Sequence, residues 1–213
     1  MSEIKYVKPA DIEKRSFAII TEELGGRTFP PDIEPVVKRV IHTSADFDYA
    51  DNLVFSEGAV ARACRALRAG AHVVTDTNMA KAGINKTILA QFGGEVHCFV
   101  ADEDVAAEAR ARGVTRSTVS MERAARLEAP LIFAIGNAPT ALVELHRLMQ
   151  AGALAPELII GVPVGFVNVV ESKELILDSP VPHIVARGRK GGSNVAAAIV
   201  NALLYQLVRR EGF

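Results

Sequence analysis

The chain has 213 residues, of which 49% are hydrophobic and 23% are charged, so it can bury the core of one sizeable globular domain. Its 24 basic and 25 acidic residues give a formal net charge of −1, which excludes a general attraction to nucleic acid or to an anionic membrane. The two cysteines, Cys64 and Cys98, lack CxxC spacing, which argues against a disulfide framework or a zinc site and favours the reducing cytoplasm.

The N-terminal region, residues 1–35, predicts a helical segment that leads into the domain. It lacks the apolar core of a signal peptide, and no apolar run in the chain approaches membrane-spanning length. Apolar residues recur at helical spacing over residues 11–24, and the glycine pair at residues 25–26 ends the pattern. On this helix the spacing predicts that Phe17 is buried and that Ser16 is exposed.

A polar cluster begins at His42, directly after the β-branched run of residues 36–41. The run predicts a buried strand, and in an open α/β sheet ligands collect at the carboxyl ends of strands. Histidine can hold or release a proton near neutral pH, so a site that needs a proton donor would use His42. The alternative is a structural histidine that forms a hydrogen bond at a strand terminus.

Strands and helices then alternate regularly to the C-terminus. Further strands are expected over residues 72–77, 96–100, 131–135, 158–162 and 183–186. Helices are expected over residues 56–69, 85–93, 102–112, 117–127, 140–150, 171–177 and 193–210, the last with Ser193 or Asn194 as its N-cap. This alternation predicts one α/β domain, residues 1–213, with a mostly parallel sheet of about six strands and helices on both faces.

Polar or glycine-rich stretches follow most of the expected strands. They contain His42, Thr75 to Asn78, Gly136 with Asn137, residues 163–166 and residues 187–193. Right-handed crossovers bring such loops to the same rim of a parallel sheet, so these residues are expected to converge. Ordinary βα turns also need Gly, Asn and Pro, which explains part of the pattern but not the three cations of residues 187–190.

Those cations belong to a glycine-rich stretch that precedes the last expected helix. Its residues are Arg187, Gly188, Arg189, Lys190, Gly191, Gly192, Ser193 and Asn194. Glycines let the backbone approach a ligand, and the free N–H groups and dipole of a helix N-terminus attract negative charge. The stretch therefore predicts an anion-binding loop, with a solvated basic loop as the alternative. Arg116 could add a bidentate carboxylate contact or could simply lie on the surface.

The pattern does not fit a nucleotide-binding enzyme. The glycine-rich stretch departs from the Walker pattern, and no GxGxxG follows the first expected strand, so a Rossmann-type enzyme is the weakest hypothesis. The sequence contains one candidate histidine and several anion donors, without a nucleophile–base pair or a metal cluster. Together these features predict a wide site for a large polycarboxylate or polyphosphate ligand.

Six stretches in the same order resemble the precorrin-8X methylmutase family of cobalamin biosynthesis, and they span almost the whole chain. They are residues 39–48, 75–86, 113–117, 136–141, 161–174 and 188–201. The resemblance implies a homodimeric α/β isomerase that moves a methyl group from C-11 to C-12 of the macrocycle, giving cobyrinic or hydrogenobyrinic acid without a cofactor. The active-site histidine of the family corresponds to His42, which would protonate the macrocycle.

The resemblance also implies a corrinoid substrate with acetate and propionate arms, which Arg116 and the donors of residues 187–193 would hold. The residues expected to bind this substrate are Ser16, Thr43, Thr75, Asp76, Arg116, Ser117, Asn137, Gly165, Arg189, Lys190, Gly191, Gly192 and Ser193. No metal site of the protein follows from it. The stretches around His42 and Thr75 resemble the cobalt-dependent branch more closely than the metal-free branch, which favours cobalt-precorrin-8 as the substrate. Hand-over to neighbouring enzymes of the pathway is also expected.

Two features leave alternatives open. Glu122 and Arg123 stand where the resemblance implies a more apolar helix, which leaves the contacts of the Arg116 segment undecided. A non-catalytic corrinoid-binding carrier would need the same anion-binding loop but would have no need of His42.

Overall fold

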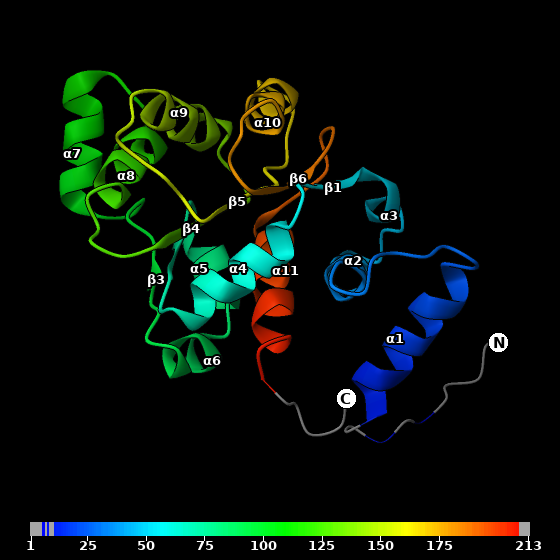
Figure 1. Cartoon of the computed structure of the whole chain (residues 1–213). Coiled ribbons are helices and arrows are strands. Elements are labelled where there is room, and N and C mark those ends of the chain that lie inside the picture. Colours follow the sequence, from blue (N-terminus) through cyan, green and yellow to red (C-terminus); the bar gives the residue numbers. More distant parts are fainter. Residues whose placement is uncertain (1–5, 7, 9–10, 209–213) are drawn as a thin grey trace.

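A computed structural model describes residues 6, 8 and 11–208. A six-stranded sheet of order β1-β6-β5-β4-β2-β3 forms its middle layer (Figure 1). The parallel strands are β2 (His72–Thr75), β3 (Val96–His97), β4 (Leu131–Ile135), β5 (Leu158–Gly161) and β6 (His183–Ala186). At one edge β1 (Leu53–Phe55) pairs antiparallel with β6. The prediction of a mostly parallel sheet of about six strands is confirmed, although β1 was not among the strands expected from the sequence.

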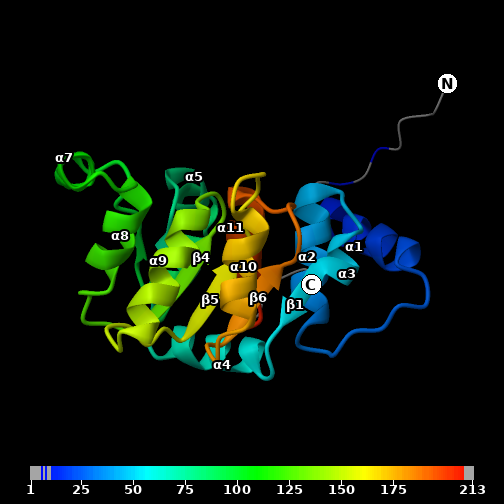
Figure 2. The same cartoon turned by 90° about the horizontal axis from the view of Figure 1, so that it is seen from above.

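Helices cover both faces of this sheet, as expected (Figures 1 and 2). One face carries α8 (Arg116–Ala124), α9 (Pro139–Gln150) and α10 (Val169–Leu177), with α7 (Glu103–Arg112) packed on α8. The other carries α4 (Ala59–Arg68), α5 (Asn78–Gly83), α6 (Lys86–Gln91) and α11 (Ser193–Tyr205). Beside α11 lies α2 (Glu34–Ser44), flanked by α1 (Ile12–Glu23) and α3 (Tyr49–Asn52).

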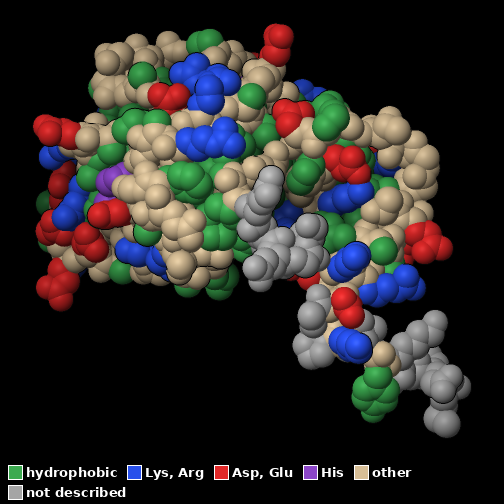
Figure 3. All heavy atoms as spheres, turned by 60° about the horizontal axis from the view of Figure 1, so that its bottom comes forward, with side chains coloured by type: hydrophobic (Ala, Val, Ile, Leu, Met, Phe, Trp, Pro, Cys, Tyr) green, Lys and Arg blue, Asp and Glu red, His purple; other side chains and the backbone are tan. Residues whose placement is uncertain are grey.

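The central strands are apolar throughout because both of their faces are covered. In β4 every side chain is buried, and successive side chains enter different cores. Phe133 packs with the residues of α9, whereas Ile132 and Ala134 pack with those of α11. On the face drawn in Figure 3, acidic and basic side chains are interspersed, in keeping with a net charge near zero. Within the described residues, no helix has the length and apolar content of a membrane span.

The predicted strand over residues 36–41 is wrong, because these residues lie in α2. Their β-branched side chains favour a strand locally, but the four buried residues Val36, Val37, Val40 and Ile41 recur at i and i+4. That spacing makes one apolar stripe on a helix, and the stripe packs against α11. His42 therefore lies in the last turn of a helix and not at the end of a strand.

Two smaller expectations also change. The short helix α5 occupies residues that were expected to form a loop after β2, and Thr77 caps it by accepting a hydrogen bond from the N–H of Ala80 at 3.1 Å. The last helix has Gly192 as its N-cap, with no side-chain cap, so the predicted capping by Ser193 or Asn194 is wrong. It ends at Tyr205, short of the expected residue 210, and residues 209–213 lie outside the described part of the chain.

A buried carboxylate joins the carboxyl ends of β2 and β4. Asp76, which is 2% exposed, accepts hydrogen bonds from the backbone N–H groups of Gly136 (2.9 Å), Asn137 (2.7 Å) and Ala138 (2.6 Å). Burial raises the pKa of this carboxyl, and the three N–H donors oppose the rise. The side chain thus fixes the turn that leads from β4 into α9.

Candidate functional site

The loops that follow β4, β5 and β6 meet at the carboxyl edge of the sheet, and their predicted convergence is confirmed by backbone contacts. Gly192 donates its N–H to the carbonyl of Val162 at 2.9 Å, and Gly165 donates to the carbonyl of Arg189 at 3.2 Å. The hydroxyls of Thr77, after β2, and Ser193, at the start of α11, lie 2.7 Å apart. The rim is therefore one connected backbone network.

Close approach of these loops explains two of the glycines. A Cβ on Gly136 would lie 2.7 Å from the Cα of Ser193, and a Cβ on Gly191 would lie 2.1 Å from the carbonyl oxygen of Val162. Neither contact is possible for a residue with a side chain unless the backbone moves. Gly191 was predicted as a ligand-approach glycine, but the structure gives it a packing role between two loops.

A buried lysine holds the glycine-rich loop from inside. Lys173 on α10 is fully buried, and its ammonium donates to the carbonyls of Gly188 at 2.7 Å and Lys190 at 2.9 Å. Burial lowers the pKa of Lys173 to about 8, because the charged form loses its hydration. With two loop carbonyls turned inward to Lys173, the loop is fixed through its backbone and its side chains extend outward.

The cations of this loop differ in their partners. Lys190 contacts the carboxylates of Asp46 and Asp48, both at 2.6 Å, so its charge is already matched. These contacts raise the pKa of Lys190, and the bond to Lys190 holds the pKa of Asp46 below its ordinary value. Arg189 lies over the ring of Phe166, 5.4 Å from its centroid, and within the described chain neither Arg189 nor Arg187 forms an ion pair.

The N-terminus of α11 adds uncompensated backbone donors. Gly192 has a φ of 140°, a backbone conformation that favours glycine. No side chain caps the first turn of α11, so its leading N–H groups face the rim together with the positive end of the helix dipole. The two arginines and this helix terminus place positive charge on the rim, whereas Lys190 ties the loop to the residues that follow α2.

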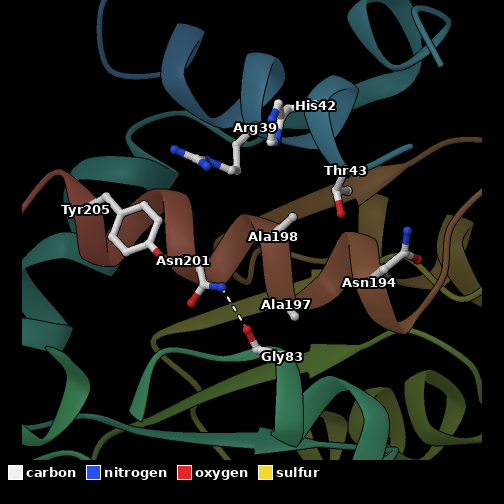
Figure 4. A pocket seen from close by; sticks show the side chains of 9 residues that line it. All are labelled: Arg39, His42, Thr43, Gly83, Asn194, Ala197, Ala198, Asn201 and Tyr205. Atoms are coloured by element: carbon white, nitrogen blue, oxygen red, sulfur yellow. Dashed lines mark hydrogen bonds between the residues drawn. The ribbon is translucent and has the colours of Figure 1, made fainter. Parts of the chain in front are cut away.

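A pocket of about 270 Å³ lies between α2 and α11 (Figure 4). It is lined by Arg39, His42, Thr43, Gly83, Asn194, Ala197, Ala198, Asn201 and Tyr205. Asn201 spans its floor by donating to the carbonyl of Gly83 at 2.8 Å and accepting from the N–H of Asn85 at 2.8 Å. The small side chains Ala197 and Ala198 leave the space open beneath the last turn of α2.

The His42 ring is oriented by α1. It stacks on the ring of Phe17 with centroids 5.2 Å apart and planes 12° apart. The guanidinium of Arg39 lies over the same Phe17 ring at 4.6 Å and over the Tyr205 ring at 5.1 Å, and it pairs with Glu13. Stacking on Phe17 holds the His42 ring in position. Because the side chain is exposed, the ring is also open toward the pocket and solvent.

The remaining predicted residues differ in how far their side chains are exposed. Thr75 and Asp76 are buried, and the Thr75 hydroxyl donates to the carbonyls of Thr77 (3.1 Å) and His97 (3.3 Å), so neither side chain faces the rim. Ser16 is half-buried, and its hydroxyl donates to the carbonyl of Ile12 within α1. Of the rest, Asn137 is exposed on the rim.

Arg116 and Ser117 begin α8, where the side chain of Arg116 is exposed and that of Ser117 is buried. Their segment adjoins the rim because the hydroxyls of Thr115 and Thr140 lie 3.0 Å apart, joining the first turns of α8 and α9. The two charged residues that departed from the expected apolar helix make ion pairs. Glu122 pairs with Arg112 and Arg147, and Arg123 pairs with Asp102 and Asp104.

Four residues of the site were not singled out from the sequence. They are Arg39, Lys173, Asn201 and Tyr205. A helical interpretation of residues 36–44 would have placed Arg39, His42 and Thr43 on one face by their spacing of three and four. Lys173 carried no signal of its own, since a lysine within a surface helix is ordinarily solvated.

The chain matches known proteins over most of its length. The sequence model of the family described as precorrin-8X methylmutase matches residues 11–206. A cobalt-precorrin-8 methylmutase of Salmonella typhimurium is 48% identical over 210 residues, which cover 94% of this chain and 96% of that protein. A precorrin-8X methylmutase of Pseudomonas aeruginosa is 42% identical over 203 residues, which cover 94% and 97%.

A solved structure agrees with these sequence matches. The crystal structure of precorrin-8X methylmutase from Thermus thermophilus superposes with a TM-score of 0.83 and 40% sequence identity, covering 91% of this chain and 96% of that one. The two proteins therefore share one fold.

The burial of Lys173 predicts a pH dependence of stability. Its pKa is about 8 in the folded chain and about 10.4 in an unfolded one, so between these pH values only the unfolded state keeps the proton. The free energy of unfolding of the wild type, measured relative to Lys173→Met, should therefore rise by roughly 2–3 kcal/mol from pH 8 to pH 10.5. Urea titrations of both proteins across this range measure it, and parallel curves would show that Lys173 is not buried as a charge.

Proposed function

The chain belongs to the precorrin-8X methylmutase family, and we propose that His42 and the rim above the sheet carry out the reaction of that family here. The protein is an isomerase of cobalamin biosynthesis: the methyl group on C-11 of the precorrin-8 macrocycle migrates to C-12. We assign the activity to the one domain that spans residues 1–213. The observation that carries the residue assignment is the position of His42, fixed by Phe17 beside the pocket.

His42 acts as the proton donor in this proposal. A proton added to the conjugated macrocycle makes it electron-poor, which favours movement of the methyl group with its bonding electrons to the adjacent carbon. Substrate and product are isomers, so the macrocycle has to return the donated proton to His42. The imidazole is therefore protonated again at the end of each cycle. Stacking on Phe17 holds the ring in one orientation, which avoids an ordering cost at each turnover.

The size of the pocket limits how much of the substrate can enter it. The pocket volume of about 270 Å³ is below the roughly 300–1,000 Å³ that encloses a drug-sized ligand, and a corrin macrocycle is larger than such ligands. Only one edge of the macrocycle therefore enters beside His42, and the rest lies over the rim. Arg189 and Phe166 provide a flat, cationic surface there.

The carboxylate arms of the substrate are held by the outward-facing donors. These are Arg187 and Arg189, the first-turn N–H groups of α11, Asn137 and Arg116, with Thr43 on the His42 side. Ser16 joins them if its hydroxyl leaves the carbonyl of Ile12 when the substrate binds. Thr75, Asp76, Gly191 and Ser117 support the rim from beneath. Lys190 acts through Asp46 and Asp48 by neutralising their charge beside the site, so we assign it a supporting role rather than direct charge recognition.

Cobalt-precorrin-8 is the proposed natural substrate. The relatives of Salmonella typhimurium and Priestia megaterium, at 48% and 46% identity, are both named for it. A relative named for precorrin-8X is 42% identical, so the names favour the cobalt form by a small margin. Turnover of both forms under the same conditions decides the matter. Hand-over of the product to neighbouring enzymes and a cytoplasmic location stay predictions.

His42→Ala should bind the corrin product as tightly as the wild type and lose about 10²–10⁴-fold in kcat, because binding resides in the anion donors and the proton comes from the imidazole. Spectroscopic turnover and product titration measure the two effects, with His146→Gln on α9 as the control histidine. More than a tenth of wild-type kcat in His42→Ala would remove His42 from this role. Product binding without turnover in the wild type as well would favour the carrier.

Arg189→Ala should raise KM with kcat nearly unchanged, since the arginine binds substrate and transition state alike. A lost charge-assisted contact costs roughly 1.5–3 kcal/mol when desolvated, or about 10–150-fold in KM.

Lys190→Ala should also raise KM, because it leaves Asp46 and Asp48 to repel the substrate. Adding Asp46→Asn and Asp48→Asn to this variant should restore the wild-type KM. A triple variant that stays as impaired as Lys190→Ala would mean that Lys190 binds the substrate directly.

A homodimer is the second part of the proposal. Four large apolar side chains around the rim are exposed: Met79 (71%), Val164 (47%), Phe166 (81%) and Val167 (77%). A second copy that covers them would also enclose the part of the macrocycle that the pocket leaves outside. Light scattering at micromolar concentration should give twice the chain mass, and a fully active monomer would contradict it.

A further inference from the structure

Two histidines and a glutamate lie together at the edge of the sheet, away from the rim. His72 begins β2 and His97 ends β3, and the parallel pairing of Val74 with His97 puts both rings on one face of the sheet. The Nδ1 of His72 and the Nε2 of His97 are 2.8 Å apart. Glu95 directly precedes β3, and one potential ligand atom from each of the three residues lies within 4.8 Å of the other two.

The contact between the rings sets the chemical state of the pair. A hydrogen bond between two ring nitrogens requires that one of them carries no proton, and an unprotonated imidazole nitrogen is the form that binds metal ions. Two imidazoles and one carboxylate are a donor set that suits Zn²⁺ and similar first-row divalent ions. The Glu95 carboxylate also supplies negative charge beside His97, which offsets the positive potential from Lys81.

The geometry is close to what an ion needs. Zn–N bonds of about 2.0–2.1 Å at a tetrahedral centre put two ring nitrogens roughly 3.3 Å apart, so the present pair would open by about 0.5 Å. The ring planes, which are 23° apart, would also turn so that both nitrogens point at the ion. The opening is feasible because β3 has only two residues and pairs with one neighbour, β2, while Glu95 is exposed and free to turn inward. Both histidines are half-buried, so an ion could reach them from solvent.

The cluster is separate from the reaction site. In the sheet order it occupies the β2–β3 edge, whereas α2 with His42 lies on the far side of α11 (Figure 1). Histidine surface, drawn purple in Figure 3, appears on the same side of the molecule as β3, beside acidic and basic side chains. Nothing in the methyl shift uses these residues.

We propose that His72, Glu95 and His97 form a binding site for a divalent transition-metal ion of the Zn²⁺ type, which ties the edge strand β3 to β2. The three side chains supply three ligands, and water completes the coordination. A bound ion would replace the hydrogen bond between the rings with bonds to both of them. It would stabilise the folded chain in proportion to its concentration, because the unfolded chain does not hold these ligands together.

The test uses the full-length chain without a histidine tag, stripped with a chelator and free of substrate. Calorimetric titration with ZnCl₂ should give one ion per chain, and Co²⁺ as a spectroscopic probe should give visible absorption bands of a low-coordinate site. Added Zn²⁺ should also raise the Tm. His97→Ala and Glu95→Gln should each weaken binding at least tenfold and abolish the Tm shift, whereas the controls His146→Gln and Glu128→Gln should bind as the wild type does.

Two results would overturn the proposal. A wild-type chain that takes up no Zn²⁺ at sub-millimolar concentration would show that the pair is only a hydrogen bond. Equal uptake by the wild type and by Glu95→Gln and His97→Ala would place the ion elsewhere, for instance at Cys64 or His42. Because Glu95 is exposed, its substitution leaves the fold intact and keeps the test valid even if a histidine variant fails to fold.

Discussion

The buried carboxylate of Asp76 is the interaction on which the rim depends. A carboxylate without water is costly, and here the three N–H donors of residues 136–138 replace its hydration. By fixing that turn, Asp76 holds Gly136 against the first residue of α11, where a Cβ would not fit. The start of α11, and with it the uncapped N–H groups, is thereby positioned relative to the ends of β2 and β4. The predicted contact between Asp76 and substrate gives way to a supporting role of this kind.

Lys173 performs the complementary function under the next loop. One buried anion binds backbone N–H groups and one buried cation binds backbone carbonyls, so both loops are held by charges that never reach the surface. A loop held through its backbone needs none of its own side chains for stability. That leaves Arg187 and Arg189 free for ligands, while Lys190 connects the loop to Asp46 and Asp48 beyond the end of α2. The histidine and the anion donors are thus coupled by one ion-pair cluster, although they come from opposite ends of the chain.

The sequence predicted what depends on local pattern and missed what depends on distant contacts. The strands β2, β4, β5 and β6 were predicted because short apolar runs between turn residues have few other solutions, and their shared edge follows from parallel topology. Residues 36–41 were mistaken for a strand because β-branched composition outweighed a four-residue spacing. The partners of Lys190 lie more than 140 positions away, and the histidines of the β2–β3 edge are brought together only by a crossover, so neither could be found from spacing.

The N-terminal helix α1 belongs to the site because it supports His42. Had His42 ended a strand, the sheet alone would have held it, but an exposed side chain in the last turn of a helix has no such support. The support comes from Phe17 and Arg39, whose stacked ring and guanidinium lie between α1, α2 and Tyr205 on α11. Three helices therefore orient one imidazole, and they leave the ring open toward the pocket. The correction from strand to helix thus changes how His42 is held: packing against α1 presents the imidazole, and in the proposed mechanism the order of α1 is a condition for proton transfer.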